Sequence, residues 1–477
     1  AEYDDHAMQY REVRRHSLRD ADALVRYETD LMRYARLIRH FLLRTPADPT
    51  SFKPRDIGEM MFMAKKFADM GEEQVYEFIR FLTMSAGDFL DEYFENDLVK
   101  TLLATSSIIG TALGVESPGS AYILLHHVMG DVDGNIGYKP AGLFPRRTNW
   151  DGLLPVPGWT GADEWVGYLP FTKRPHVIDP PDGYFASANN ALTDSTFPNV
   201  IGTYWEPIDR ISRIRDLITA KPQVSVDDMA AMQTDVACPL AAELMPLMLR
   251  VMDQRFPATS EAPVRDILAQ WDYRMAEQSA AASIYETTYL NLLENIFKDE
   301  LGPALYRRYL GLTVFAPRAL RHILRTGRSG WLDDVGTPQT ETLADAVEKS
   351  LRQALTDLRN RFGADVKHWT WDRLHTLTFR HPLGERKLLD RLFDLGPYPT
   401  SGSHLTVNKK QYDYTRPFSV REGVSQRMIV DLANPAVALH VLPTGESGLL
   451  GNAHNSDQID LYLEGGYHPS WLTRSDI

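Results

Sequence analysis

The periodic pattern of apolar residues stops in the middle of the chain and then resumes. Up to about residue 130, and again from about 201 to 379, apolar residues recur at the three- and four-residue spacing of helices. Between 131 and 198 glycine, proline and tryptophan become frequent and this spacing is lost. Such a stretch is typical of a long loop-rich region packed by its own aromatic side chains. We therefore predict two helical parts separated by irregular structure.

Two helices are predicted in particular detail. The first runs from Ser17 to Leu43, with Ser17 and Asp20 forming a capping box at its start. The second runs from Thr342 to Phe362 and ends at Gly363. Its apolar face is expected to consist of Leu343, Val347, Leu351, Leu355, Leu358 and Phe362.

The carboxyl-terminal part has the period of two that is typical of strands. Met428, Val430 and Leu432 alternate with other residues, and Val437, Leu439 and Val441 do so again. Asn434-Pro435 lies between the two runs and is expected to form a turn. The tail therefore predicts an antiparallel hairpin, and the chain as a whole belongs to the α+β class.

Charge and composition exclude several classes of protein. The chain has 477 residues and a formal net charge of −13, which disfavours binding to nucleic acid or to anionic lipid. Cys238 is the single cysteine, so there is no intramolecular disulfide and no cysteine-rich metal site, and a buried structural thiol is expected. No apolar run reaches about 18 residues, so no membrane span is predicted. The first residues, Ala1 to Asp5, are acidic and lack a signal core, and the compartment stays open.

The common sequence motifs for nucleotide, phosphate and metal binding are not found in the sequence. No glycine-rich dinucleotide or phosphate loop is present. His126 and His127 are adjacent and would point apart, while His375 and His381 lie six residues apart. The histidines are therefore predicted to be structural, and no metal site is expected.

A family resemblance begins near Asp133. The words that carry it are Asp133-Gly134-Asn135-Ile136-Gly137-Tyr138, Leu154-Pro155-Val156-Pro157-Gly158-Trp159-Thr160-Gly161, Gly167-Tyr168-Leu169-Pro170-Phe171, Ala188-Asn189-Asn190 and Ile208-Asp209-Arg210-Ile211. Later words are His381-Pro382-Leu383, Ser425-Gln426-Arg427, Asp431-Leu432 and Gly445-Glu446-Ser447-Gly448. From about residue 131 to the end, the chain resembles the second half of the β subunit in the penicillin acylase (penicillin amidase) family of N-terminal-nucleophile (Ntn) hydrolases.

This resemblance implies a mechanism and two site residues. The family's nucleophile is a serine at the amino terminus of the β subunit, with its free α-amine as the base. A side-chain amide and a backbone N–H stabilise the tetrahedral oxyanion. Asn189 matches the family's oxyanion asparagine, and Arg210 matches an arginine near that site. The alternatives are that Asn189 is a turn residue and that Arg210 makes a structural ion pair.

The region before Asp133 does not match the start of such a β subunit. Its words include Leu43-Arg44-Thr45-Pro46-Ala47-Asp48-Pro49-Thr50 and His126-His127-Val128-Met129-Gly130, which resemble the middle of a phytoene-desaturase-like FAD oxidoreductase. The flavin-binding segments of that family are absent, so no flavin is predicted. The junction is placed at Val132-Asp133-Gly134, which divides the chain into a helical segment, 1–132, and an acylase-like part, 133–477. The segment that carries the nucleophile is expected to be absent.

The resemblance implies an α+β fold in which a helical amino-terminal segment precedes an incomplete Ntn-hydrolase αββα sandwich with a large helical insertion. The expected activity is hydrolysis of a linear N-acyl amide, such as an acylated β-lactam or an acyl-homoserine lactone. The alternatives are an FAD-dependent oxidoreductase fragment or a non-catalytic hybrid remnant. A small N-acyl substrate is the expected partner, and the oligomeric state is open. No cofactor is predicted, although a family-type calcium ion stays undecided because Asn199 stands where a carboxylate is expected.

Overall fold

The structure is a computed structural model of the whole chain. The residues that it describes are 10, 13–15, 17–27, 29–30, 57–58, 60–62, 65, 75–77, 80–81, 84–96, 99–100, 129–130, 136–138, 144–170, 173–194, 196–385, 388–434, 437–449 and 451–471. The chain divides into two compact units. The first comprises Ala1–Gly142 and Thr172–Phe185, and the second comprises Leu143–Phe171 and Ala186–Ile477. The junction predicted at 132–134 lies outside the described residues and stays a prediction.

The first unit has a small aromatic core. Tyr27, Phe81, Phe89 and Phe94 are buried together, and α5 (Ala86–Asp91) begins at the N-cap Ser85. Short strands β1 (Met129–Gly130), β2 (Ile136–Tyr138) and β5 (Val177–Ile178) form an antiparallel sheet in the order β1-β2-β5.

The helix predicted from Ser17 is present as far as it is described. Ser17 Oγ accepts a hydrogen bond from the Asp20 N–H at 3.1 Å. The predicted capping box is only half formed, because the Asp20 carboxylate accepts instead from the N–H groups of Glu95 and Asn96. The continuation of this helix from 31 to 43 lies outside the described residues.

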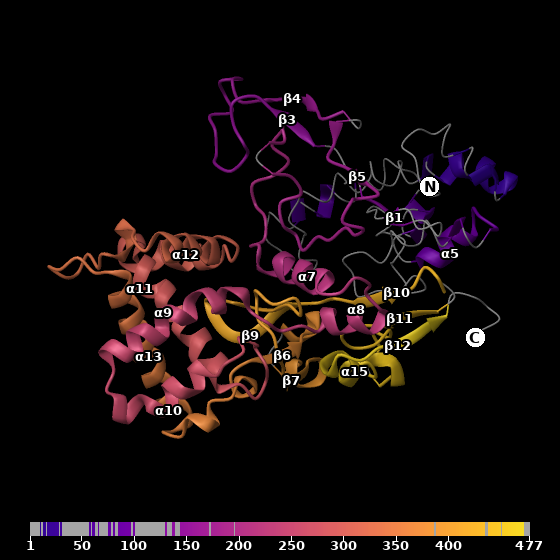
Figure 1. Cartoon of the computed structure of the whole chain (residues 1–477). Helices are drawn as coiled ribbons and strands as arrows, with labels where there is room; N and C mark the ends of the chain where they lie inside the picture. The colour runs from indigo at the N-terminus through magenta and orange to yellow at the C-terminus, as the bar shows by residue number, and fades with distance from the viewer. Residues whose placement is uncertain are drawn as a thin grey trace. The chain divides into compact units, whose positions relative to one another are not determined.

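The second unit contains a helical group and a group of sheets (Figure 1). The helices are α7 (Asp209–Thr219), α8 (Val226–Gln233), α9 (Pro239–Arg255), α10 (Ala258–Ala269), α11 (Ala280–Leu310), α12 (Phe315–Thr326), α13 (Leu343–Phe362), α14 (Asp390–Phe393) and α15 (Ile459–Glu464). Helices α9, α11, α12 and α13 share one large core, which also takes in Trp369 and Trp371. This is the helical insertion that the sequence predicts between the early and late strands.

Helix α13 begins one residue after its predicted start, because Thr342 is its N-cap, and it ends at Phe362 as predicted. Thr342 and Asp345 form a reciprocal capping box, and the helix stops at Gly363, whose φ of 86° favours glycine. The predicted apolar positions from Leu343 to Leu358 are buried, and Phe362 is partly buried against the same core.

The cap of α13 gives a first testable prediction. Thr342→Ala removes the side-chain oxygen that accepts the Asp345 N–H, and so leaves one helix donor without its partner. We expect the free energy of unfolding to fall by about 1 kcal/mol, measured by urea denaturation. Thr342→Ser keeps the hydroxyl and should stay close to the wild type, while an equal loss in both variants would contradict the capping explanation.

The strands of the second unit form separate sheets. The bounds are β3 (Pro145–Arg147), β4 (Trp165–Tyr168), β6 (Thr376–Phe379), β7 (Leu395–Pro399), β8 (Lys410–Asp413), β9 (Arg416–Gly423), β10 (Arg427–Val430), β11 (Val437–Val441) and β12 (His468–Trp471). Strands β3 and β4 pair with each other. A four-stranded sheet has the order β7-β6-β9-β8, in which β6 and β9 are parallel, and a three-stranded antiparallel sheet has the order β10-β11-β12. Side chains from both larger sheets and from α15 meet in one buried cluster.

The predicted tail hairpin is present, but it buries the other face of its first strand. Strands β10 and β11 pair in antiparallel register, with Val430 opposite Ala438. Met428, Val430 and Leu432, the alternating apolar residues, are exposed, while Arg427 and Ile429 are buried. The reason is tertiary, because Arg427 donates to the backbone carbonyls of Leu461, Tyr462 and Gly466 and lies over the Tyr462 ring.

The loop-rich region is irregular as predicted, but its aromatic residues do not all pack. Arg147 lies over the rings of Trp150 and Trp165, whereas Trp159 is 90% exposed. Across the residues that the structure describes, no helix is long and apolar enough to cross a membrane.

Candidate active site

The candidate site is built around Asn189, in the loop that precedes α7. The backbone of Asn189 has a φ of 61°, in the left-handed region that asparagine tolerates better than most residues. Its carbonyl accepts a hydrogen bond from the Glu206 N–H at 2.9 Å, which joins the two ends of the loop. The backbone at Asn189 is therefore held by a residue, Glu206, that lies outside the turn containing Asn189.

Arg210 orients the Asn189 side chain. It lies in the first turn of α7, and its Nη2 donates to Asn189 Oδ1 at 2.8 Å. A guanidinium can only donate, so the amide atom that faces it must be the oxygen. The Asn189 NH2 group therefore points away from Arg210, and the residue is exposed. A neutral amide donor with a fixed direction is the arrangement that an oxyanion requires.

Glu206 holds Arg210 from the other side. Its carboxylate lies 3.8 Å from Arg210 Nη2, accepts from Lys409 Nζ at 3.1 Å and lies 3.3 Å from His404 Nε2. Burial would raise the pKa of Glu206, but the hydrogen bond from His404 and the charge of Lys409 outweigh it and lower that pKa to about 2. Glu206 is therefore ionised at neutral pH and can only accept hydrogen bonds.

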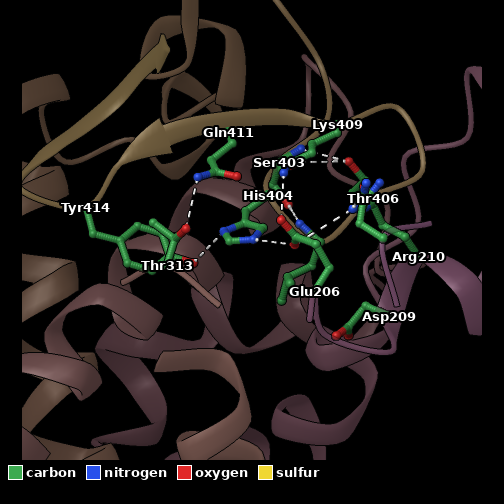
Figure 2. A network of polar contacts seen from close by, with 12 residues as sticks. Glu206, Asp209, Arg210, Thr313, Ser403, His404, Thr406, Lys409, Gln411 and Tyr414 are labelled. Carbon is green, nitrogen blue, oxygen red and sulfur yellow. Dashed lines mark hydrogen bonds and ion pairs between the residues drawn. The ribbon is translucent and has the colours of Figure 1, made fainter. Parts of the chain in front are cut away.

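His404 continues the network into the core, as Figure 2 shows. It is 1% exposed, and burial lowers its pKa against the opposing effect of the Glu206 hydrogen bond, so the imidazole is neutral at neutral pH. Because Glu206 only accepts, His404 Nε2 carries the proton and donates. His404 Nδ1 is then an acceptor for the Tyr414 hydroxyl, which lies 3.2 Å away. The Tyr414 oxygen lies 3.2 Å from the hydroxyl of Tyr289 on α11.

Two further ion pairs hold α7 in place. Asp209, the residue before Arg210, is buried and accepts from both Nη atoms of Arg321 on α12. One turn later, Arg213 makes a bidentate pair with the buried Asp235. The helix that carries Arg210 is thus attached to the helical core at two points, which limits the positions that the guanidinium can reach.

Other residues of potentially reactive types have structural roles. Cys238 is buried and burial raises the pKa of its thiol to about 12, as expected for an unreactive cysteine. His375 is buried and stacks on Trp371. Within the described ranges, no group of three or more His, Cys, Asp or Glu side chains could hold a metal ion.

Comparison with known proteins decides the family. The pattern of the family described as penicillin amidase matches residues 120–477, which is most of the chain. The chain belongs to the penicillin amidase family. The match begins before the predicted junction at 132–134, and the alternative of a flavin oxidoreductase gains no support from the comparisons.

Individual relatives agree with this assignment. The chain is 30% identical over 363 residues to an acyl-homoserine lactone acylase of Pseudomonas syringae pv. syringae, covering 72% of this chain and 44% of the relative. It is 28% identical over 380 residues to the penicillin acylase 2 proenzyme of Pseudomonas sp. SE83, covering 77% of this chain and 47% of the relative. The chain therefore spans less than half the length of the curated relatives that it matches.

A solved structure supports the fold. The thermostable penicillin G acylase of Alcaligenes faecalis superposes with a TM-score of 0.50 at 18% identity, covering 73% of this chain and 64% of that chain. At this identity the likeness concerns the fold alone. It confirms the predicted penicillin-amidase-type α+β architecture.

Within this family framework, the structure brings together the two predicted site residues. Asn189 and Arg210 are joined by a direct hydrogen bond, although they lie 21 positions apart. Sequence reasoning missed Glu206, His404 and Lys409. The i,i+4 spacing of Glu206 and Arg210 could have indicated that pair. No local signal connects Glu206 with His404, which lies 198 positions later.

Proposed function

We propose that the chain carries the oxyanion-stabilising part of an amidase that hydrolyses linear N-acyl amides, with Asn189 as the side-chain donor. The observation that supports this most directly is the hydrogen bond from Arg210 to Asn189 Oδ1, because it turns the amide NH2 outward. In amide hydrolysis the C–N bond breaks, water adds to the acyl carbon, and a carboxylic acid and an amine are released. Attack on the carbonyl carbon places negative charge on its oxygen, and the Asn189 NH2 group would donate to that oxygen.

The charges around Asn189 favour an anion. Arg210 and Lys409 are positive, Glu206 is negative and His404 is neutral, so the cluster has a net charge of about +1. A positive field beside an amide donor stabilises a developing oxyanion and also attracts a carboxylate. Both properties suit an enzyme whose acid product is an anion.

The proposed substrates follow the relatives. The relatives are named as an acyl-homoserine lactone acylase and a penicillin acylase. We assign this chain to the same class, an acyl-homoserine lactone, an acylated β-lactam or a similar N-acyl amide.

The test is hydrolysis of a chromogenic N-acyl amide by the purified chain, by itself and with the nucleophile-bearing segment of a related acylase added in trans. In whichever of these two samples hydrolyses the substrate, Asn189→Ala should lower the rate about 100- to 1,000-fold, because it removes one oxyanion donor. Asn190→Ala is the matched control, since that neighbouring side chain bonds only to the backbone of Ala188 and Ala191 in the described structure. An equal loss in both variants, or no Asn189-dependent turnover in either arrangement, would overturn the proposal.

A further inference from the structure

A continuous set of polar contacts connects the helical core to the Asn189 amide. It runs through Tyr289, Tyr414, His404, Glu206, Arg210 and Asn189, and we call it the site chain. Its successive atoms lie 3.2, 3.2, 3.3, 3.8 and 2.8 Å apart. The members come from α11, the β8–β9 turn, the loop before β8, the loop before α7 and α7 itself. The site chain thus connects parts of the second unit that are distant in sequence, and it ends at Asn189.

Each contact in the site chain has a defined direction. Glu206 is ionised and only accepts, which places the imidazole proton on His404 Nε2. His404 Nδ1 must then accept from the Tyr414 hydroxyl, and the Tyr414 oxygen is left to accept from Tyr289. At the other end, the guanidinium of Arg210 only donates, which fixes the Asn189 oxygen. Reversing any one of these hydrogen bonds would place a donor against a donor or an acceptor against an acceptor.

The site chain is costly to bury, which makes a role in fold stability alone a poor explanation. The loop that carries His404 is mostly buried although it is polar, with Thr400, Ser403, Thr406 and Asn408 each at most 6% exposed. Buried polar groups contribute little net stability, and apolar residues of the same shape often serve as well. What such a network supplies is a single arrangement of its members.

Without Glu206 and His404, the Arg210 guanidinium would no longer be held in one position beside Asn189. Arg210 makes a close hydrogen bond to Asn189 and a longer ion pair with Glu206. Glu206 is in turn shared between Lys409 and His404. If His404 stopped donating, the carboxylate would be free to move toward the two cations and draw the guanidinium away from Asn189.

We propose that Glu206, His404 and Tyr414 are positioning residues for the Asn189 amide, acting through Arg210. This inference rests on the proposed function, in which that amide is the oxyanion donor. A displacement of a catalytic group by about 1 Å can lower a rate about 100-fold, so the effect of these residues should appear in kcat.

A pair of neighbouring tyrosines provides the first experiment. Tyr412 and Tyr414 are both buried and lie two residues apart, but the Tyr412 hydroxyl donates to Glu286, whereas the Tyr414 hydroxyl lies 3.2 Å from His404 Nδ1. Tyr414→Phe should lower kcat about 10-fold with KM within about twofold, because His404 Nδ1 loses its hydrogen-bond donor and the ring loses one of its two anchors. Tyr412→Phe loses a buried hydrogen bond of the same kind and should change kcat less than twofold. Equal effects on kcat in both variants would show a structural role and overturn the proposal.

Substitutions of His404 test the same idea by rescue. His404→Leu removes the donor to Glu206 and should lower kcat about 10- to 100-fold. His404→Gln places an amide N–H near the position of Nε2 and should recover kcat to within about threefold of the wild type. A glutamine variant as impaired as the leucine variant, with both of them folded by circular dichroism, would contradict the assignment.

A spectroscopic readout makes the test independent of turnover. In protein labelled with 15N-asparagine, the side-chain NH2 signals of Asn189 are identified by their loss in Asn189→Gln. We expect these signals to shift in Tyr414→Phe and His404→Leu and to stay in place in Tyr412→Phe. Unchanged signals in the first two variants would overturn the positioning role even if the enzyme is active. Shifted signals in a chain without any hydrolysis would support the positioning role and count against the proposed function instead.

Discussion

Replacing Arg321 by methionine is expected to lower the free energy of unfolding by about 3–5 kcal/mol. Arg321 is 6% exposed and bonds to both carboxylate oxygens of Asp209, which is 1% exposed. Methionine fills much of the volume but leaves the Asp209 carboxylate buried without its partner. The large effect is the penalty for that unpaired charge and exceeds the net contribution of the ion pair itself.

Urea denaturation of the full chain measures this loss, and α12 supplies a matched control. Arg321 also donates from Nε to Glu243 on α9 at 2.8 Å. Arg325 lies one turn beyond Arg321 and contacts Glu243 too, but its side chain is 60% exposed. Arg325→Met should therefore cost less than about 1 kcal/mol, as exposed ion pairs usually do. Adding Asp209→Asn to Arg321→Met removes the stranded charge and should restore part of the stability. A double variant no more stable than Arg321→Met would contradict the unpaired-charge explanation.

Replacing Glu286 by glutamine is expected to flatten the pH dependence of stability. Glu286 is buried in α11 and accepts from the Tyr412 hydroxyl at 2.7 Å. Burial, only partly opposed by that hydrogen bond, raises the pKa of Glu286 from 4.5 to about 7. The folded state therefore holds a proton on this carboxyl more tightly than the unfolded state does.

The sign of the effect follows from this difference in proton binding. The protonated carboxyl stabilises the fold fully below pH 4.5, and this stabilisation is lost as the pH rises through about 7. The loss amounts to about 3 kcal/mol, at about 1.4 kcal/mol for each pKa unit. Relative to the wild type, Glu286→Gln should therefore gain about 3 kcal/mol between pH 4 and pH 9.

Chemical denaturation at a series of pH values measures this gain. Glu294→Gln is the control, because Glu294 lies on the same helix, is half exposed and pairs with Lys298. The free energy of unfolding of Glu294→Gln should follow that of the wild type at every pH in the series. A Glu286→Gln curve that also runs parallel would show that this carboxyl does not change its charge near neutral pH in the folded protein.

The sequence by itself determined the features that depend on neighbouring residues. The α13 helix was predicted to within one residue because its apolar spacing and its terminal glycine both lie within 22 positions of one another. The pairing of β10 with β11 was predictable because only a few residues, among them Asn434-Pro435, separate two alternating runs in the sequence. Asn189 and Arg210 came from resemblance to the penicillin amidase family, since no pattern of spacing distinguishes them from ordinary loop and helix residues.

Only the tertiary structure decided which face each element buries and which residues complete the site. The buried face of β10 is set by Arg427 reaching the carbonyls around α15, against the simple rule that the apolar face turns inward. Glu206, His404 and Tyr289 belong to different elements, and nothing near each residue in the chain indicates the others. Their contacts depend on how α7, α11 and the loop before β8 pack together. The surroundings then set the charge of each residue, because the hydrogen bond from His404 and the charge of Lys409 keep the pKa of Glu206 low against the effect of burial, whereas burial lowers the pKa of His404 and keeps it neutral.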